Sequence, residues 1–436
     1  MDQALLAAVS GINATQTYLD TIGNNIANVN TDGYKEQDVD FTDLLSEQIA
    51  GASAPPVSAA EGAGINPISV GSGVAVGSIS SDLSEGSLQQ TGLANDVAIS
   101  GNGFLVAEDG GQQVYTRDGQ LSPDANGDLA TPTGALIQGW QAVNGTVDTN
   151  APVTALNIPS GQVIPAEATT EITMGGNIPA WSGSGTATPV PATITAYDSL
   201  GNPVGVTLTF TLVANTANEW TLQGTVPGSG SSSTPQDLFT TPPTVTFNPT
   251  TGQVSGITGV TANADGSFSL PVTTMPSGYS FPSGDKWDID FPTPGSVSAL
   301  TQFAGSATAS AVSQNGAAAG TLTSYSIDQD GMIVGSFSNG ASENLGLIAL
   351  ASFANAGGLE STGNLNYVAT GNSGQAEIGT PGTGSRGSLV GGSVESSNVN
   401  LASQLTDLVV AQEAYQANTK VVNTDSTVTQ SLVQMA

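Results

Sequence analysis

The sequence contains no cysteine and no histidine among its 436 residues. Disulfide bonds, thiol nucleophiles, histidine-based acid–base catalysis and ordinary zinc sites are therefore excluded. It also contains no run of about 18 apolar residues, so no transmembrane helix is expected. Because the chain begins Met1-Asp2-Gln3, without a basic segment or a cleavage site, we expect no cleavable Sec-type signal peptide.

Positive charge is also scarce. Five basic residues face 36 acidic ones, and the net charge is −31. Nucleic acids and anionic bilayers are bound by clusters of Lys and Arg, so we expect no nucleic-acid binding and no membrane insertion. Only 9% of residues are charged, which favours an acidic, solvated exterior. Calcium binding or adaptation to acid or salt would also favour such a surface.

Carboxylates are then the main candidates for chemistry. Asp124, Asn126 and Asp128 have the spacing of a calcium loop, but Leu129 stands where that loop needs glycine, so a hairpin turn is favoured. Asp288 and Asp290 are two residues apart on an expected strand, where they share one exposed face. We therefore expect no catalytic residues, no metal and no cofactor.

Between the two ends the sequence is typical of β-structure, with 55 Gly and 23 Pro and many alternating apolar residues. Asn126-Gly127 and Thr133-Gly134 predict hairpin turns. The apolar residues Phe41, Leu44, Leu45 and Ile49 predict a short helix, followed by a loose stretch over 51–64. The clearest predicted strands are Ala192–Tyr197, Val204–Val213, Trp220–Thr225, Thr244–Phe247 and Trp287–Phe291.

The N-terminal segment predicts an amphipathic helix from about Gln3 to about Val29, ended by the turn Thr31-Asp32-Gly33. Gly23 weakens its interior, so the helix needs a partner for its apolar stripe. The stripe consists of Leu5, Val9, Ile12, Leu19, Ile22, Ile26 and Val29.

The C-terminal segment predicts a second helix with a heptad frame, which indicates a coiled-coil-like packing surface. The polar residues in this frame would weaken an isolated dimer, so order is expected to come with assembly. The frame consists of Leu401, Leu405, Leu408, Gln412, Tyr415, Thr419, Val422, Ser426, Thr429 and Val433.

Both ends contain short sequence motifs. Ser10-Gly11-Ile12 with Ala27-Asn28-Val29-Asn30-Thr31-Asp32-Gly33-Tyr34-Lys35 is similar to the N-terminal signature of bacterial flagellar rod and hook proteins. Ser397-Asn398-Val399-Asn400-Leu401 with Val410-Ala411-Gln412-Glu413-Ala414-Tyr415-Gln416-Ala417-Asn418-Thr419-Lys420-Val421 is similar to their C-terminal signature. Ser100–Phe104, Tyr115–Gly119 and Gly358–Asn364 resemble a shared β domain of the same family.

The fold class that follows is a mainly β, multi-domain body whose N- and C-terminal helices pair as a coiled-coil-like inner domain. We predict an N-terminal helix over 1–30, a connector over 31–70 and the first half of a shared β domain over 71–145. An inserted outer β domain follows over 146–295, then the second half of the shared domain over 296–395 and the C-terminal helix over 396–436. The large insertion most resembles the hook members of the family.

The resemblance implies a structural subunit of a curved, flexible tube that joins the flagellar rod to the filament, with no enzymatic activity. It implies copies of the same chain as partners, together with rod, hook-cap and hook–filament junction proteins and the flagellar export apparatus. It places the protein outside the cell, in the flagellum. The alternatives are a distal rod or junction subunit and, more remotely, a β-rich extracellular enzyme or adhesin.

The resemblance and the two stripes together assign an assembly interface. Its predicted residues are Leu5, Val9, Ile12, Leu19, Ile22, Ile26, Asn28, Asn30, Gly33, Tyr34, Lys35, Asn398, Leu401, Leu405, Leu408, Gln412, Tyr415, Asn418 and Val422.

Overall fold

The computed structural model describes residues 2–52, 66–159, 161–181, 187–214, 216–228, 234–281 and 287–435. The chain is mainly β, with one long helix at each end, α1 (Asp2–Ala27) and α2 (Leu401–Met435). This confirms the predicted β-rich chain with terminal helices. Two compact units form: the first contains residues 1–160, 325–335 and 343–436, and the second contains 161–324 and 336–342.

The first unit contains both helices and a β body. Its main sheet has the strand order β27-β11-β7-β8-β30-β29. Its strands are β1 (Gln37–Asp43), β2 (Glu47–Ala50), β3 (Ile68–Val70), β4 (Val74–Ser81), β5 (Leu88–Gln90), β6 (Val97–Ser100), β7 (Phe104–Asp109), β8 (Gln112–Thr116), β9 (Ser122–Pro123), β10 (Leu129–Ala130), β11 (Leu136–Gln141), β12 (Thr154–Ala155), β27 (Ser342–Ile348), β28 (Leu350–Ser352), β29 (Glu360–Gly363), β30 (Asn366–Val368), β31 (Glu377–Gly379), β32 (Ser388–Gly391) and β33 (Ser393–Glu395).

The short helix predicted around Phe41 to Ile49 is wrong. Phe41 lies in β1 and Ile49 lies in β2, which pair antiparallel with β4 and β3, and Leu44 and Leu45 lie between these two strands. The spacing of the apolar residues is typical of a helix, but β1 instead forms cross-strand hydrogen bonds with β4 and packs against α1. Val39 is buried, and the Phe41 ring meets the Tyr18 ring edge-on at 5.7 Å. Tertiary pairing therefore overrides the local pattern. Residues 53–65, which include most of the predicted loose stretch, lie outside the described residues.

The predicted hairpin turns are confirmed. Asn126-Gly127 joins β9 to β10, and Thr133-Gly134 joins β10 to β11. Gly127 has φ +90°, a conformation that glycine adopts without steric cost. The Asp124 carboxylate accepts the backbone N–H groups of Asn126 and Asp128 at 2.8 and 2.9 Å. The calcium-like spacing therefore serves a turn closed by its own side chain.

The second unit has a five-stranded and a six-stranded sheet, with the strands predicted from the alternating pattern confirmed near their expected limits. Most pairings are antiparallel, but β14 runs parallel to β22 and β23. Its strands are β13 (Val163–Ile164), β14 (Glu171–Pro179), β15 (Val190–Tyr197), β16 (Pro203–Leu212), β17 (Glu219–Val226), β18 (Gln236–Asp237), β19 (Thr244–Phe247), β20 (Val254–Ile257), β21 (Phe268–Pro271), β22 (Asp288–Phe291), β23 (Leu300–Phe303) and β24 (Ser310–Gln314). Two further strands contain residues of both units, β25 (Gly320–Ile327) and β26 (Met332–Phe337).

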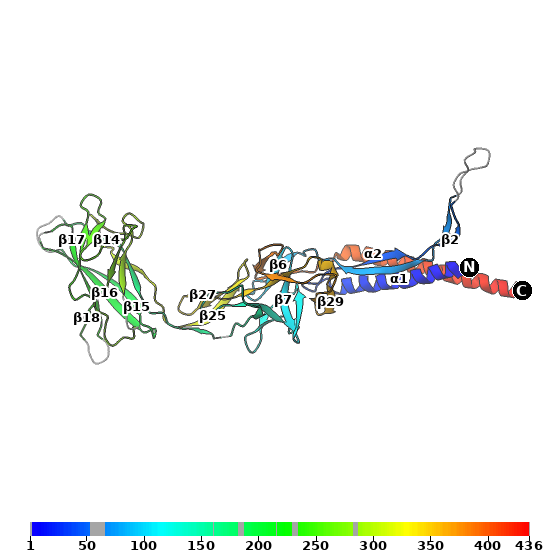
Figure 1. The fold of residues 1–436 in the computed structure, drawn as a ribbon, viewed down its shortest axis with the longest axis horizontal. Helices are drawn as coiled ribbons and strands as arrows, with labels where there is room; N and C mark the ends of the chain where they lie inside the picture. Colours follow the sequence, from blue (N-terminus) through cyan, green and yellow to red (C-terminus); the bar gives the residue numbers. More distant parts are fainter. Residues whose placement is uncertain are drawn as a thin grey trace, which may run out of the picture. The chain divides into compact units, whose positions relative to one another are not determined.

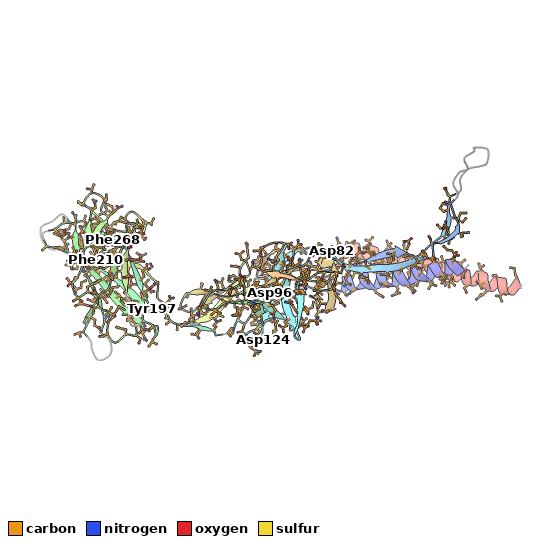
Figure 2. All side chains as sticks on the ribbon, in the orientation of Figure 1. Asp82, Asp96, Asp124, Tyr197, Phe210 and Phe268 are labelled. Carbon is orange, nitrogen blue, oxygen red and sulfur yellow. The ribbon has the colours of Figure 1, made fainter. Side chains whose placement is uncertain are left out.

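Each unit buries its own aromatic core. In the second unit the core includes Phe210 and Phe268, which are labelled in Figure 2, together with Trp220 and Trp287. In the first unit Phe104, Tyr115 and Trp140 belong to a separate buried cluster. Inward residues alternate with outward ones along strands such as β16, as the period of two requires.

Candidate assembly site at the terminal helices

The two helices lie side by side and run antiparallel (Figure 1). The Asn25 amide donates a hydrogen bond to Gln404 at 3.2 Å, near the end of α1 and the start of α2. Fourteen residues back along α1, Gly11 faces Asn418, fourteen residues further along α2. Asn400 caps α2, because its side-chain oxygen accepts the N–H groups of Ala402 and Ser403. The two ends of the sequence thus form one helical element.

The buried face of α1 is built from small and polar residues. Ala8, Gly11, Ala14 and Asn25 are buried there, together with Ile22. A Cβ added at Gly11 would lie 2.7 Å from the Asn418 amide nitrogen, so glycine permits the close approach of α2. Of the predicted stripe, only Ile22 is fully buried; Leu5, Ile12, Leu19 and Ile26 are half-buried and Val9 is exposed.

The face of α2 with the most burial is rotated from the predicted heptad frame. Gln404 and Ala411 are buried, and Leu408, Tyr415, Asn418 and Val422 are half-buried. These positions are separated by alternating gaps of four and three residues. Three predicted interface residues lie outside this face and are exposed to solvent: Leu401, Leu405 and Gln412. Their assignment to an assembly interface stays a prediction.

The Asn25 side-chain amide is buried where α1 meets the β body, and both its nitrogen and its oxygen are hydrogen-bonded. Its nitrogen donates to the Gln37 carbonyl at 2.8 Å as well as to Gln404. Its oxygen accepts the Tyr34 hydroxyl and the Gln37 N–H, both at 3.0 Å. Burial raises the pKa of the Tyr34 hydroxyl to about 12, with smaller contributions from Tyr367 and Glu36. A satisfied buried network of this kind fixes the geometry of the junction.

The second feature of the junction is an ionic cluster, which we define as Lys35, Glu395 and Arg117. Lys35 Nζ lies 2.6 Å from Glu395 Oε1, and Arg117 Nη1 lies 3.2 Å from Glu395 Oε2. Desolvation lowers the pKa of Lys35, whereas its hydrogen bond to Glu395 acts in the opposite direction. The Arg117 guanidinium also stands 5.4 Å from the centre of the Phe104 ring.

Backbone groups also form hydrogen bonds with this cluster. Lys35 donates to the Ser84 carbonyl at 2.6 Å, Arg117 donates to the Gly101 carbonyl at 3.0 Å, and Glu395 accepts the Gly86 N–H at 2.7 Å. Buried ion pairs tolerate desolvation only when such hydrogen bonds are made. The cluster therefore joins the end of α1, the β body and the strand that leads into α2.

The signature residues that flank the two helices also lie at this junction. Asn398 accepts the Glu36 N–H at 2.8 Å and donates to the Asp82 carbonyl at 2.9 Å. Gly33 has φ +74°, and its N–H donates to the Glu395 carbonyl at 2.6 Å. Asn28 bonds back to Asn24 within α1, whereas Asn30 is exposed. Gly33 and Asn398 therefore hold the junction together within one chain, whereas Val410–Val421 of the C-terminal signature lies along α2.

Sequence reasoning did not select Asn25, Gln404, Glu395 or Arg117 as site residues, although Arg117 lies in a motif of the shared β domain. One signal could have found the ionic cluster. The chain has only five basic residues, and Lys35 and Arg117 both lie within family motifs. A scarce cation in a motif is a good candidate for a buried partner of a carboxylate.

Among the residues that the structure describes, the paired carboxylates of the second unit form no comparable network. Asp288 and Asp290 are half-buried on one face of β22, and Glu171 lies opposite Asp288 on β14. Burial raises the pKa of Glu171, with further contributions from Asp290 and Asp288. Among the described residues there is no group of three or more acidic side chains suited to hold a metal ion.

Comparison with known proteins identifies the family of the chain that contains this helical junction. Family models match four segments: flagella basal body rod protein at 5–35, flagellar hook protein FlgE/F/G D1 domain at 98–179, flagellar basal body protein FlaE D2 domain at 179–317, and flagellar basal body rod FlgEFG protein C-terminal at 390–435. The chain is 36% identical over 456 residues to "Flagellar hook protein FlgE" of Borreliella burgdorferi, and the match covers 100% of both chains.

The chain belongs to the flagellar hook protein family. It is also 35% identical over 472 residues to the FlgE hook protein of Treponema pallidum, again covering 100% of both chains. The match to FlgE of Escherichia coli is 33% over 445 residues, covering 99% of this chain and 100% of that one. Family membership across the whole length identifies a structural subunit of the flagellar hook and basal body. Among the described residues, none of the helices is both long enough and apolar enough to span a membrane.

Proposed function

We propose that this hook protein polymerises with copies of itself into the curved tube that transmits torque from the rod to the filament. The observation that carries the proposal is the helix pair, which the junction ties to the β body. Leu6, Leu401, Leu405 and Val410 are large apolar side chains that these two helices leave exposed. Exposed apolar patches on soluble proteins mark interaction sites.

The helix pair serves as a coiled-coil-like inner domain of the tube. The alternating four- and three-residue gaps between the buried and half-buried residues of α2 support this, as does the antiparallel contact with α1. The predicted interface residues differ in role. Gly33, Tyr34, Lys35 and Asn398 hold the pair to the body, and Asn418 faces Gly11 of α1. The exposed apolar residues on the helices are available to neighbouring copies.

Folding of the two helices against neighbouring copies also controls polymerisation. The buried face of α1 contains few large apolar side chains, so the pair gains little from its own packing. We infer that in the free subunit the helices are largely unfolded, and that they order as copies add to the tube. The β units then act as preformed bodies, and flexible connections between them keep the tube soft in bending and stiff in twist.

The partners that follow are further copies of the chain at both ends of each subunit, rod proteins below, a cap during growth and junction proteins above. Export by the flagellar apparatus delivers the subunit outside the cell. A distal rod subunit is the alternative, and images of the assembled polymer separate the two. A curved tube supports the hook, whereas a straight one supports the rod.

The decisive experiment deletes the helices. Purified full-length chain is expected to form tubes that are visible by electron microscopy. The chain lacking residues 1–30 and 397–436 is expected to stay monomeric, while its tryptophan fluorescence still shows a cooperatively folded second unit. Tubes formed equally well by the shortened chain would overturn the mechanism.

A further inference from the structure

The sequence contains five Asn-Gly pairs, in which the asparagine side chain is chemically labile. The backbone nitrogen of such a glycine can attack the side-chain carbonyl carbon of the asparagine, because glycine has no side chain to hinder the approach. A pair reacts only if its side-chain amide and its glycine N–H are free to meet. The five pairs are Asn102-Gly103, Asn126-Gly127, Asn144-Gly145, Asn315-Gly316 and Asn339-Gly340.

Three of the pairs are held by hydrogen bonds at both groups. The Asn126 amide donates to the Asp124 carboxylate at 3.3 Å, and the Gly127 N–H donates to the Asp124 carbonyl at 3.1 Å. The bonds of the other two pairs run from Asn315 to the Thr170 hydroxyl at 2.8 Å, Gly316 N–H to the Gln314 side chain at 2.6 Å, Asn339 to the Ala318 carbonyl at 2.7 Å and Gly340 N–H to the Phe337 carbonyl at 2.9 Å. These bonds must break before either group can react.

The fourth pair, Asn102-Gly103, is held through its backbone. The Asn102 carbonyl accepts the Gly387 N–H at 2.6 Å. Gly103 is buried, and a Cβ added there would lie 3.3 Å from the Ala351 carbonyl. The backbone on both sides of the peptide bond between Asn102 and Gly103 is therefore restrained by neighbouring segments.

The pair Asn144-Gly145 differs from the other four. It forms the tip of a two-residue hairpin over 143–146, just beyond the end of β11, and both residues have positive φ, +51° and +73°. Asn144 is exposed, and among the residues that the structure describes neither its side-chain amide nor the Gly145 N–H forms a hydrogen bond. Two backbone bonds between Val143 and Thr146, at 2.9 and 3.2 Å, close the turn. Opening it is therefore a local event.

We propose that Asn144 is a site of spontaneous covalent modification, converted to aspartate and isoaspartate by the backbone nitrogen of Gly145. The nitrogen gives up its proton and bonds to Asn144 Cγ, the Cγ–Nδ2 bond breaks, and Nδ2 leaves with that proton as ammonia. Water then opens the five-membered imide at either carbonyl carbon. One water is consumed and one ammonia is released, with no oxidant or reductant. The reaction belongs to the single subunit and does not depend on the proposed polymer.

The product changes the contact between this hairpin and β27. A Cβ added at Gly145 would lie 3.3 Å from Glu343 Oε1, so the Glu343 side chain lies against the turn. The Asn344 amide donates to the Gly145 carbonyl at 3.3 Å. A carboxylate at position 144 brings a second negative charge close to Glu343, and isoaspartate adds one carbon atom to the backbone of a two-residue turn. Both changes are expected to weaken the contact as the protein ages.

The test compares all five pairs within one molecule. Full-length protein is incubated at mildly alkaline pH in water enriched in heavy oxygen and is then digested after aromatic residues, which place the five pairs in five different fragments. Mass spectrometry measures the loss of ammonia and the gain of heavy oxygen in each fragment. Asn144 is expected to react about tenfold or more faster than Asn126, Asn315 and Asn339, because their hydrogen bonds must break first. Asn102 is also expected to react more slowly than Asn144. Conversion of any other pair as fast as Asn144 would overturn the proposal.

Unfolded protein provides the control for the role of the fold. In concentrated urea the advantage of Asn144 is expected to disappear, because all five pairs are then free. An advantage that persists in urea would mean that the local sequence selects Asn144, and the structural argument would fail.

Three variants complete the test. Asn144→Gln should abolish conversion in its fragment, because the longer side chain would have to close a six-membered ring. Asn126→Gln is the matched control and should leave conversion of Asn144 unchanged. Asp124→Ala removes both acceptors of the Asn126 side-chain and backbone N–H groups and should speed conversion of Asn126 several-fold. No increase at Asn126, in a protein whose tryptophan fluorescence is unchanged, would show that hydrogen bonds do not select the reactive pair.

Discussion

Lys35 and Glu395 stand 360 residues apart in sequence, and their side chains meet at 2.6 Å with 1% of each exposed to solvent. Arg117 contacts the other oxygen of the same carboxylate. One residue just after α1, one from the β body and one just before α2 therefore depend on each other. The pairing of the chain ends is built into the body of the subunit, and the helices extend from it.

The first prediction concerns this carboxylate. Glu395→Gln leaves two cations buried without a counterion and is expected to lower the free energy of unfolding of the first unit by about 3–5 kcal/mol. Urea denaturation followed by far-ultraviolet circular dichroism measures the change. Glu413→Gln, on the exposed surface of α2, is the control and should have almost no effect. A loss below about 1 kcal/mol for Glu395→Gln would show that the cluster is not a main support of the junction.

The second prediction compares two glycines within α1. Gly11→Ala places a methyl group 2.7 Å from the Asn418 side-chain nitrogen, so that side chain must shift and polymerisation should weaken. Gly23→Ala meets no atom within 4 Å and should stabilise α1 by up to about 1 kcal/mol. Thermal unfolding and the critical concentration for assembly measure both. Equal gains from the two substitutions would mean that α1 and α2 do not pack closely in the functional protein.

The third prediction concerns pH. Burial raises the pKa of Asp118, with smaller contributions from Asp32 and Asp96, so folding favours the protonated form of this carboxyl. Its contribution to stability is present in full below the ordinary pKa of aspartate, about 3.9, and is lost as pH rises through the raised pKa. Asp118→Asn should therefore be more stable than the unsubstituted chain at neutral pH, and the difference should shrink as the pH falls. Urea midpoints measured across acidic to neutral pH give the result; a difference that stays constant with pH would contradict it.

The fourth prediction follows from the net charge of −31. Copies of so acidic a chain repel one another, and salt screens this repulsion within about 10 Å at 0.1 M and about 3 Å at 1 M. The rate of polymerisation should rise roughly tenfold or more between low and high ionic strength. Light scattering measures the rate. Sodium chloride and sodium sulfate at matched ionic strength distinguish screening from general salting-out, and a rate independent of ionic strength would contradict the prediction.

The sequence by itself determined the features that depend on neighbouring residues. Both terminal helices follow from periodic apolar residues, and the Asn126-Gly127 turn follows from the backbone freedom of glycine. The strands from Ala192 to Phe291 follow from the alternation of side chains between the two faces of a sheet. The family motifs at both ends also indicated that the ends belong together. Each of these features depends on interactions between residues that are close together in the sequence.

Only the tertiary structure decided which residues meet. The segment from Phe41 to Ile49 has helical spacing, yet it forms strands because β4 and β3 supply hydrogen bonds to it. The covered face of α2 is centred on Gln404 and Ala411 because Asn25 and Gly11 of α1 fix its rotation, and no heptad count reveals that. Glu395 could not be singled out locally, because its role depends on Lys35 and Arg117 lying against it from distant parts of the chain. Burial and charge pairing are properties of the assembled fold, and they determine how this subunit presents its two helices.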